Sequence, residues 1–276
     1  MNLILLDKTE LDGDVSRPND PNSSDVPGES ERRQLIRLDD RRATHLRKVL
    51  RVEPGRTLRI GVVGGGRGVA TVVAIEGKTV VLDVDPSTLE HHPPPKPRLS
   101  LILALPRPAV LHRLLQLAAT VQVEELILTN SWRVEKSFFG SPALEPEAID
   151  RHLRLGAEQG MTTRLPEVRI ENRFVDMLTA LVAPSSTELR LVAHPDSPSI
   201  ETVLTADHAP ASHHRLAIGP EGGWIDREIE SFAENGFTAV GIGPWILRVE
   251  AAVAAFVGIT AALERARDRR GTLELI

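Results

Sequence analysis

The sequence predicts an α/β protein in which a small β-rich domain precedes a larger domain built on a parallel sheet. Three observations carry this prediction. The chain has 276 residues, enough for two moderate domains. Four prolines within the stretch 91–97 predict an extended linker between domains at residues 1–92 and 98–276. Short β-like runs dominate before this linker, whereas strand-like and helix-like runs alternate after it.

The first domain is expected to form a small barrel or a strongly bent sheet. Residues 1–7 are typical of a first strand, and residues 12–30, rich in Asp, Ser, Asn and Pro, of a mobile loop. A helix is predicted over residues 40–50, because its apolar residues share one face. These residues are Ala43, Leu46, Val49 and Leu50. Further strands are predicted at 57–63, 68–75 and 79–84.

The second domain begins with a nearly continuous apolar run at residues 99–105, typical of a strand that is buried on both faces. Pro108 then suits the first turn of a helix, and leucines follow it at helical spacing. Alternation continues along the chain and predicts a parallel sheet. The predicted strands are 125–129, 189–193, 215–219 and 237–243, and the predicted helices are 145–159, 174–182 and 226–235.

Composition narrows the class of protein. Hydrophobic residues make up 41% of the chain, too many for a disordered protein, and the lack of cysteine excludes disulfides and thiolate chemistry. The first residues lack the long apolar run of a secretory signal, and the apolar run 251–263 is too short to cross a bilayer. We therefore expect a cytoplasmic protein with no membrane segment. The adjacent histidine pairs 91–92 and 213–214 do not have metal-ligand spacing, so no metal site is expected.

Charge is distributed unevenly. The net charge is -5, yet residues 31–60 carry an excess of arginine and lysine over acidic residues. Such a basic segment on an acidic protein is typical of a local surface that contacts phosphates. A solvated arginine face on an ordinary helix explains the same charges equally well. The candidate RNA-binding residues are Arg41, Arg42, His45, Arg47, Lys48 and Arg51.

Two glycine–proline loops are the strongest local signal. The first, 219–224 with sequence GPEGGW, follows an apolar strand and precedes a helix, and its glycines let the backbone approach a ligand closely. The second, 243–250 with sequence GPWILRVE, also lies between a strand and a helix. Loops at the carboxyl ends of adjacent strands line one crevice, where ligands of parallel sheets bind. A tight strand-to-helix turn without a ligand is the alternative.

Arg248 and Glu250 lie just before a helix that is almost wholly apolar. Charges in this position are expected to face an opening, or else to pair with each other and cap the helix. The helix itself, at 251–263, is expected to be buried on all sides.

The two loops together closely resemble those of the RsmE family, SPOUT-class methyltransferases that methylate N3 of a uridine in 16S ribosomal RNA. The motif at 45–51, HLRKVLR, is similar to that family's N-terminal PUA-like RNA-binding barrel. LALPR at 103–107 and GAEQ at 156–159, with LPEV at 165–168 after it, match its other signatures in the same order. The resemblance covers essentially the whole chain.

The resemblance implies a second domain tied into a C-terminal trefoil knot, a homodimer, and S-adenosylmethionine as the cofactor. It implies a role in ribosomal RNA processing and ribosome biogenesis, with 16S RNA or the small ribosomal subunit as the partner. The implied catalytic residues are Arg248 and Glu250. The implied cofactor-binding residues are Ala193, His194, Gly219, Pro220, Glu221, Gly222, Gly223, Ile242, Gly243, Ile246, Leu247 and Arg248.

The chain departs from the family pattern at several positions. Val249 and Ala251 replace two threonines, and Arg107 with Pro108 replaces a lysine and a glycine. Ile225 replaces a serine, which leaves Asp226 as the expected cap of the following helix. The arginine and the glycines are retained.

Methyl transfer to uracil N3 requires an unpaired base, removal of the N3 proton, and stabilisation of the negative charge that spreads onto the carbonyl oxygens. A guanidinium such as that of Arg248 suits the last task. The candidate bases are Glu158, Glu221, Glu250 and water. Two other functions stay open: a non-catalytic ribosome-assembly factor that keeps the RNA surface, and an enzyme with a nucleotide cofactor. The missing dinucleotide fingerprint counts against the latter.

Overall fold

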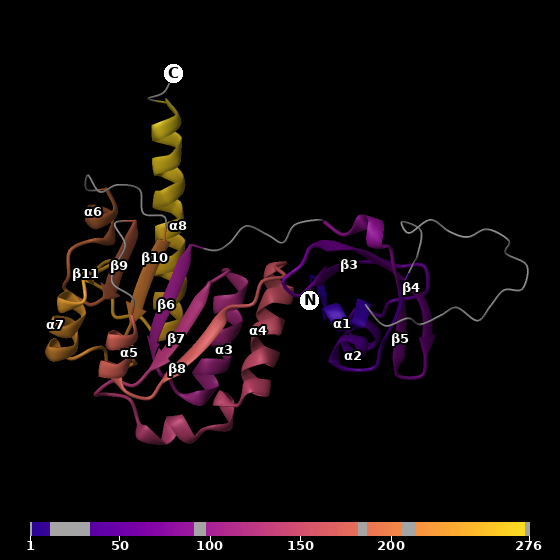
Figure 1. The fold of residues 1–276 in the computed structure, drawn as a ribbon, viewed down its shortest axis with the longest axis horizontal. Coiled ribbons are helices and arrows are strands. Elements are labelled where there is room, and N and C mark those ends of the chain that lie inside the picture. Colours follow the sequence, from indigo (N-terminus) through magenta and orange to yellow (C-terminus); the bar gives the residue numbers. More distant parts are fainter. Residues whose placement is uncertain (1, 12–33, 91–97, 182–186, 206–212, 274–276) are drawn as a thin grey trace, which may run out of the picture. The chain divides into compact units, whose positions relative to one another are not determined.

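A computed structural model describes residues 2–11, 34–90, 98–181, 187–205 and 213–273. The predicted loop at 12–30 and the predicted linker at 91–97 lie outside these ranges. The chain forms two compact units, one of residues 1–95 with 157–165 and the other of residues 96–156 with 166–276 (Figure 1). The boundaries predicted at 1–92 and 98–276 stay a prediction.

The first unit is a curled sheet with the strand order β1-β3-β4-β5-β2 among the residues that the structure describes. β1 pairs with β3 in parallel, and the other neighbours are antiparallel. A register shift between Val72 and Ala74 marks a bulge in β4, and bulges increase the bend of a strand. The elements are β1 (Ile4–Leu6), α1 (Lys8–Leu11), β2 (Gln34–Leu38), α2 (Arg41–Lys48), β3 (Thr57–Val62), β4 (Arg67–Glu76) and β5 (Thr79–Val84).

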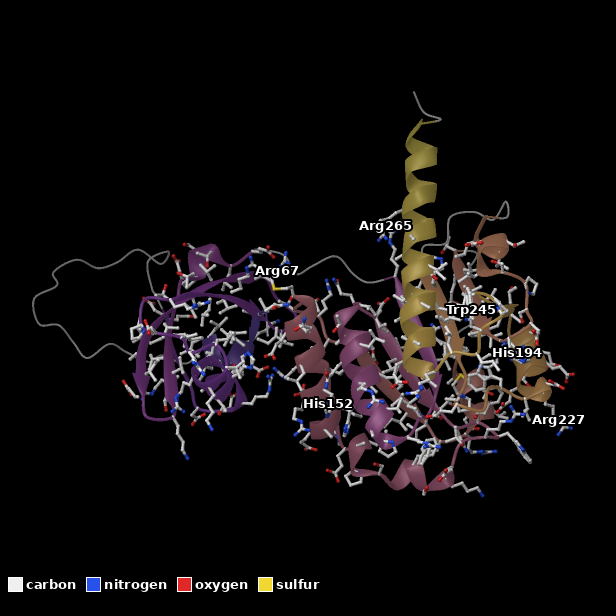
Figure 2. The ribbon with its side chains drawn as sticks, turned by 180° about the vertical axis from the view of Figure 1, so that it is seen from behind. Arg67, His152, His194, Arg227, Trp245 and Arg265 are labelled. Atoms are coloured by element: carbon white, nitrogen blue, oxygen red, sulfur yellow. The ribbon has the colours of Figure 1, made fainter. Side chains whose placement is uncertain are left out.

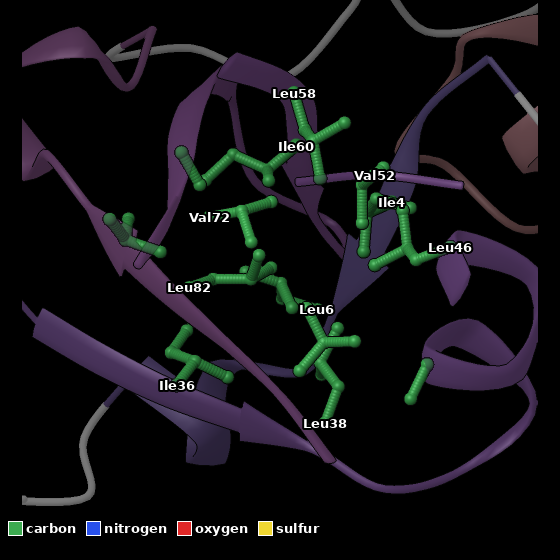
Figure 3. Close-up of a cluster of buried hydrophobic side chains, with 14 residues drawn as sticks. Ile4, Leu6, Ile36, Leu38, Leu46, Val52, Leu58, Ile60, Val72 and Leu82 are labelled. Atoms are coloured by element: carbon green, nitrogen blue, oxygen red, sulfur yellow. The ribbon is translucent and has the colours of Figure 1, made fainter. Parts of the chain in front are cut away.

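One apolar cluster fills the inside of this curled sheet (Figure 3). Side chains from β1 to β5 meet there, with Leu46 of α2 at one side. The first half of β3 alternates exposed and buried residues, whereas β1 and β5 are buried along nearly their whole length. Asp40 caps α2, since its carboxylate accepts a hydrogen bond from the backbone N–H of Arg42 at 2.8 Å. α2 ends at Lys48, so Val49 lies beyond it and is exposed; its predicted place on the buried face is wrong.

The second unit contains a parallel sheet with the order β11-β9-β10-β6-β7-β8 within the described ranges, so the predicted α/β class is confirmed. β6 is buried along Ser100–Ala104, as the apolar run predicts, and Pro108 begins α3. The strands are β6 (Leu99–Ala104), β7 (Glu125–Thr129), β8 (Glu167–Glu171), β9 (Glu188–Ala193), β10 (His213–Ile218) and β11 (Thr238–Val240). The helices are α3 (Pro108–Thr120), α4 (Pro146–Gly160), α5 (Phe174–Ala180), α6 (Ile200–Thr205), α7 (Asp226–Glu234) and α8 (Val249–Leu273).

The long helix α8 corrects one prediction. Val249, Val253, Phe256 and Thr260 are buried, whereas Ala251, Ala254, Gly258 and Ala262 are exposed. The helix is therefore buried on one side of the single chain and not on all sides as predicted. No helix in the described part of the chain is long and apolar enough to span a membrane.

Candidate cofactor site

A cleft lies at the carboxyl ends of β9, β10 and β11, where parallel sheets bind their ligands. Its walls are the residues just after these strands together with the first turns of α8. The cleft encloses about 640 Å³ of empty space, part of it open to solvent, which is within the range of small-molecule sites. Figure 2 shows His194 and Trp245 in this part of the second unit.

Most of the predicted cofactor-binding residues lie around this one cleft. The residues that line it are Ala193, His194, Gly219, Pro220, Glu221, Gly223, Ile242, Gly243, Ile246 and Leu247. Gly222 and Arg248 are not among the lining residues. The two glycine–proline loops therefore face the same space, as the sequence predicts, and cofactor binding by these residues stays a prediction.

Sequence reasoning missed several residues of the cleft. Pro195, Ile218, Gly241, Val249, Ala252 and Phe256 also line it, together with Trp245 of the second glycine–proline loop. Most of them are apolar and carry no chemical signature in the sequence. Val249 takes the place of a family threonine, so this part of the wall is apolar where the family has a hydroxyl.

The loop after β11 depends on Gly243. Its φ is +138°, a conformation that side chains disfavour, and a Cβ there would lie 2.4 Å from the Trp245 ring. Glycine thus lets the indole of Trp245 fold back against its own loop. The same ring is 66% exposed and lines the cleft, so it is available to a ligand.

Gly222 does not line the cleft and contacts Arg133 instead. A Cβ on it would lie 2.9 Å from Cδ of Arg133, and its carbonyl oxygen accepts a hydrogen bond from the Arg133 guanidinium. Arg133 follows β7, so this contact joins the first glycine loop, which follows β10, to the loop after a strand two places away in the sheet. No sequence signal connects these two residues, which are 89 positions apart.

Arg248 and Glu250 have different surroundings. Glu250 accepts hydrogen bonds from Arg113 of α3 at 2.6 and 3.1 Å, and this guanidinium is the main cause that lowers the pKa of Glu250. Arg248 is exposed, and its guanidinium makes no hydrogen bond or ion pair with another described residue. The alternative in which Arg248 pairs with Glu250 to cap the helix is therefore wrong; Arg113 holds Glu250.

The candidate bases also separate. Glu158 is 1% exposed and is held by both guanidinium nitrogens of Arg41, at 2.7 and 2.9 Å, and it does not line the cleft. Glu221 is exposed and lines the cleft. Of the predicted carboxylates, Glu221 is thus the one with direct access to a bound ligand.

The start of α7 corrects another prediction. Ile225 is the N-cap residue, Asp226 is the first helical residue, and the side chain of Asp226 does not cap the helix. The carboxylate of Glu228 instead reaches back and accepts a hydrogen bond from the backbone N–H of Ile225 at 2.9 Å.

The predicted RNA-binding residues of α2 divide into two groups. Arg41 is bound to Glu158, and Arg42 donates to Glu10, to Asp40 and to the carbonyl of Leu5. Burial is the main cause that lowers the pKa of His45, which leaves it neutral near pH 7. Arg47, Lys48 and Arg51 make no ion pair with another described residue, and Lys48 and Arg51 are exposed.

A protein-family model described as an RNA methyltransferase domain matches residues 93–261, more than half of the chain. The chain belongs to the RNA methyltransferase domain family. Among family relatives, ribosomal RNA small subunit methyltransferase E of Treponema pallidum is 27% identical, with 86% of this chain and 88% of the relative covered. Methyltransferase E 1 of Borreliella burgdorferi is 26% identical, with 82% and 92% covered. The predicted resemblance to the RsmE family is confirmed.

Solved structures of other proteins share the fold. Ribosomal RNA small subunit methyltransferase E from Neisseria gonorrhoeae, bound to S-adenosylmethionine, has a TM-score of 0.68 and 21% identity, and the match covers 95% of this chain and 98% of that one. A Legionella pneumophila chain in complex with the same cofactor has a TM-score of 0.65 and 22% identity, with 87% and 95% covered. Among the described residues, no group of three or more histidines and carboxylates is placed to hold a metal ion.

Proposed function

We propose that this protein transfers a methyl group from S-adenosylmethionine to N3 of a uridine in 16S ribosomal RNA. One observation carries the proposal: both glycine–proline loops and the end of β9 line a single cleft at the carboxyl edge of the sheet. The names of the Treponema and Borreliella relatives, small subunit methyltransferases, support the RNA substrate. The bound cofactor of the Neisseria structure supports the choice of methyl donor.

The residues of the cleft suit this cofactor. Glycine backbone at 219, 223 and 243 can approach a ligand closely, and an apolar wall of Ile246, Leu247 and Phe256 suits an adenine ring. The carboxylate of Glu221 suits a cationic sulfonium. When bound, S-adenosylmethionine supplies an electrophilic methyl carbon, so the chain has mainly to align the acceptor nitrogen and manage its proton.

Three side chains divide that work. Glu221, or a water that it orients, takes the proton from uracil N3 as the N3–CH3 bond forms and the S–CH3 bond breaks. Arg248 stabilises the negative charge that spreads onto the uracil oxygens, because its guanidinium is not consumed by an ion pair. The hydrogen bond from Arg113 lowers the pKa of Glu250, so Glu250 is a weak base; it fixes the first turn of α8, which begins directly after Arg248.

Three finer features belong to the same proposal. The first unit is a PUA-like RNA-binding barrel, which its curled sheet supports. The second unit is a SPOUT domain with a trefoil knot. This is supported by the position of three strand ends and α8 around one cleft. The protein is a cytoplasmic homodimer, and the exposed small residues of α8 at 251, 254, 258 and 262 support a close helix contact between two copies.

The deciding experiment measures N3-methyluridine in ribosomal RNA. Nucleosides from cells that lack the protein are analysed by mass spectrometry, and small subunits from these cells are then treated with the purified protein and labelled S-adenosylmethionine. We expect the modified nucleoside to be missing in the cells and restored in vitro. An unchanged amount in the cells contradicts the proposal. Subunit binding without methyl transfer favours the non-catalytic assembly factor instead.

The basic segment has its own test. Reversal of Arg47 and Arg51 to glutamate is expected to weaken RNA binding and to flatten its salt dependence, because two phosphate contacts are lost. Cofactor affinity is the control, since the cleft is built from other residues. An unaltered salt slope shows that the two arginines form a solvated face only.

A further inference from the structure

The second unit contains another cavity beside the cofactor cleft. Its lining includes Ser131 and Trp132 after β7, Lys136 in the following turn, Phe174 at the start of α5, and Arg227 on α7. It encloses about 1140 Å³ of empty space, part of it open to solvent. None of its lining residues is shared with the cofactor cleft.

The chemistry of this cavity is that of a nucleotide site. Trp132 is 80% exposed, which is unusual for so large an apolar ring unless it meets a partner. Lys136 and Arg227 are exposed cations at the same cavity, and Figure 2 shows Arg227 beside α7. Glu228, the acidic residue among the lining, is 6% exposed, and both of its carboxylate oxygens accept hydrogen bonds from backbone N–H groups. The exposed side chains of the lining are therefore the indole of Trp132, the two cations and the apolar Val175, and none of them is acidic.

A buried polar group also points to a ligand. Ser131 lines the cavity and is only 6% exposed, yet its hydroxyl oxygen has no hydrogen-bond partner among the residues that the structure describes. Buried hydroxyl groups are nearly always hydrogen-bonded in folded proteins. A ligand with polar edges, seated over the apolar ring of Phe174, satisfies this hydroxyl.

The cavity is tied to the cofactor cleft through backbone. Glu228 accepts from the N–H of Trp132 at 2.8 Å and from the N–H of Ile225 at 2.9 Å, and it thereby joins the Trp132 loop to the end of the first glycine loop. Arg133 makes a second connection at the carbonyl of Gly222. Gly223 lines the cofactor cleft and Ile225 lines the second cavity. Because Gly223 and Ile225 are two residues apart, their Cα atoms lie at most about 8 Å from each other.

We propose that this cavity binds an unpaired nucleotide of the RNA substrate next to the base that enters the cofactor cleft. The indole of Trp132 stacks on the base, Lys136 and Arg227 contact the flanking phosphates, and Ser131 hydrogen-bonds the base edge. The proposal rests on the proposed function, since it assigns part of the RNA to a place on the enzyme. A peptide partner fits the aromatic ring equally well but does not require two unopposed cations.

The test separates stacking from charge. Naked 16S RNA from cells that lack the protein is bound to each variant in a filter-retention assay over a range of salt concentrations. Trp132→Ala is expected to lower RNA affinity roughly 5- to 150-fold with an unchanged salt slope, and Trp132→Phe to recover most of it. Lys136→Ala with Arg227→Ala is expected to reduce the slope by about 1.4, the loss of two single-strand phosphate contacts.

Two controls make these changes specific. Arg151→Ala removes an exposed arginine on α4 that lines neither cavity, and it should leave both affinity and slope within about twofold of the wild type. Calorimetry should give the same S-adenosylmethionine affinity in every variant. The proposal is overturned if the cavity variants bind RNA as the wild type does, or if Arg151→Ala weakens binding as much as they do. Retention of a ribosomal protein but not of naked RNA, lost in Trp132→Ala, would assign the cavity to a protein partner.

The binding assay does not depend on catalysis, so the two proposals can fail separately. If the wild type transfers no methyl group but its RNA affinity falls in Trp132→Ala, the proposed function fails and the nucleotide cavity stands. If methyl transfer proceeds with equal KM for the RNA in the wild type and in Trp132→Ala, the function stands and the cavity assignment fails.

Discussion

The two edges of the parallel sheet in the second unit differ in what their polar groups contact. Near the amino ends of the strands, charged side chains satisfy one another: Arg215 of β10 bonds Glu125 of β7 and Glu188 of β9 at 2.8 and 2.9 Å. Arg169 of β8 adds a second cation to Glu125. At the carboxyl ends, glycine backbone lines a cleft, and the exposed Arg248 lies in sequence between two residues of its lining.

The polar groups at the amino ends of the strands bind one another, whereas those at the carboxyl ends are available to a ligand. The arginines at the amino end hold the pKa of Glu125 and of Glu188 below the ordinary value, against the opposing effect of burial. Because these arginines and glutamates already bond one another, we do not expect them to bind a ligand. At the carboxyl end, backbone groups and one guanidinium are left for a ligand, as sites in parallel sheets require. Substitutions at the amino ends of the strands should therefore change stability, and substitutions at the carboxyl ends should change binding and catalysis.

Loss of Arg248 should produce the largest effect on function. Arg248→Ala is expected to reduce the single-turnover rate roughly 100- to 1,000-fold, or about 3 to 4 kcal/mol, because one well-placed charge contact in the transition state is lost. The melting temperature should not change, since the side chain is exposed and has no ion-pair partner among the described residues. Arg248→Lys should recover only part of the rate, because an ammonium lacks the planar fork of guanidinium. A preserved rate in the alanine variant would remove Arg248 from the reaction.

Loss of Arg215 should have the reverse profile. Arg215→Met leaves Glu125 and Glu188 each with one cation fewer, and we expect the free energy of unfolding to fall by about 3 kcal/mol. Thermal melting measures this change, and calorimetry at low temperature should give unchanged cofactor affinity. The control is Arg173→Ala, which breaks an exposed pair with Asp176 and should cost below about 1 kcal/mol. Equal effects of the two variants would mean that the network adds nothing beyond a surface pair.

Gly243 and Gly222, both in loops at the carboxyl ends of the strands, should differ in their effect on cofactor affinity. Gly243→Ala introduces a Cβ against the Trp245 ring at a positive φ, so a strain of about 1–3 kcal/mol and a displaced indole should lower cofactor affinity tenfold or more. Gly222→Ala meets only the flexible side chain of Arg133 and should leave cofactor affinity within about twofold. Calorimetry on both variants decides. A larger loss in the Gly222 variant would mean that its carbonyl contact with Arg133 shapes the cleft.

The smallest expected effect is a pH dependence of stability that arises from His213, near the amino ends of the strands. Burial lowers the pKa of His213, whose ring lies near Glu124, Glu188, Arg215 and His214 and hydrogen-bonds Ser100 at 2.9 Å. The unfolded chain then binds a proton that the folded chain refuses, so stability is full above about pH 6.5 and falls as the pH drops below that value. Glu125 and Glu188, with lowered pKa values, add a second loss below about pH 4.5.

Urea unfolding of the wild type and of His213→Gln, measured from pH 8 to pH 5, tests the first loss. Glutamine can keep a hydrogen bond to Ser100 without titrating, so the decline below about pH 6.5 should be smaller in the variant. Burial also lowers the pKa of His45 and His152, which should leave a residual decline. Parallel curves for the two proteins would show that Glu124 accommodates a charged His213.

Much of the fold could be predicted because burial repeats with the period of each element. The run at 99–105 and the leucines after Pro108 carry this signal, and β6 and α3 form there. β8 was not predicted, since Glu167–Glu171 is an edge strand whose charged residues are exposed or ion-paired and so lacks an apolar pattern. The burial of α8 on one side only was not predicted either, because Ala251–Leu263 is apolar around its whole circumference.

The site was predictable where its chemistry depends on residue type along the chain. Glycines and prolines at 219–223 and 243–244 mark loops in any sequence, and they meet at the cleft. The contacts that position these loops were not predictable, because Arg133 reaches Gly222, and Arg113 reaches Glu250, across most of the domain. Ordinary arginines and glutamates acquire these roles only through the fold.

The placement of the aromatic residues gives the molecule a built-in optical readout. The chain has three tryptophans and no tyrosine, so its near-ultraviolet emission comes from Trp132, Trp224 and Trp245 alone. Trp245 lies at the cofactor cleft, Trp132 at the second cavity, and Trp224 is buried beside Phe174 and Phe232. Replacement of one exposed indole by phenylalanine leaves the other as the solvent-sensitive emitter. Quenching by cofactor and quenching by RNA can thus be followed separately in the unlabelled protein.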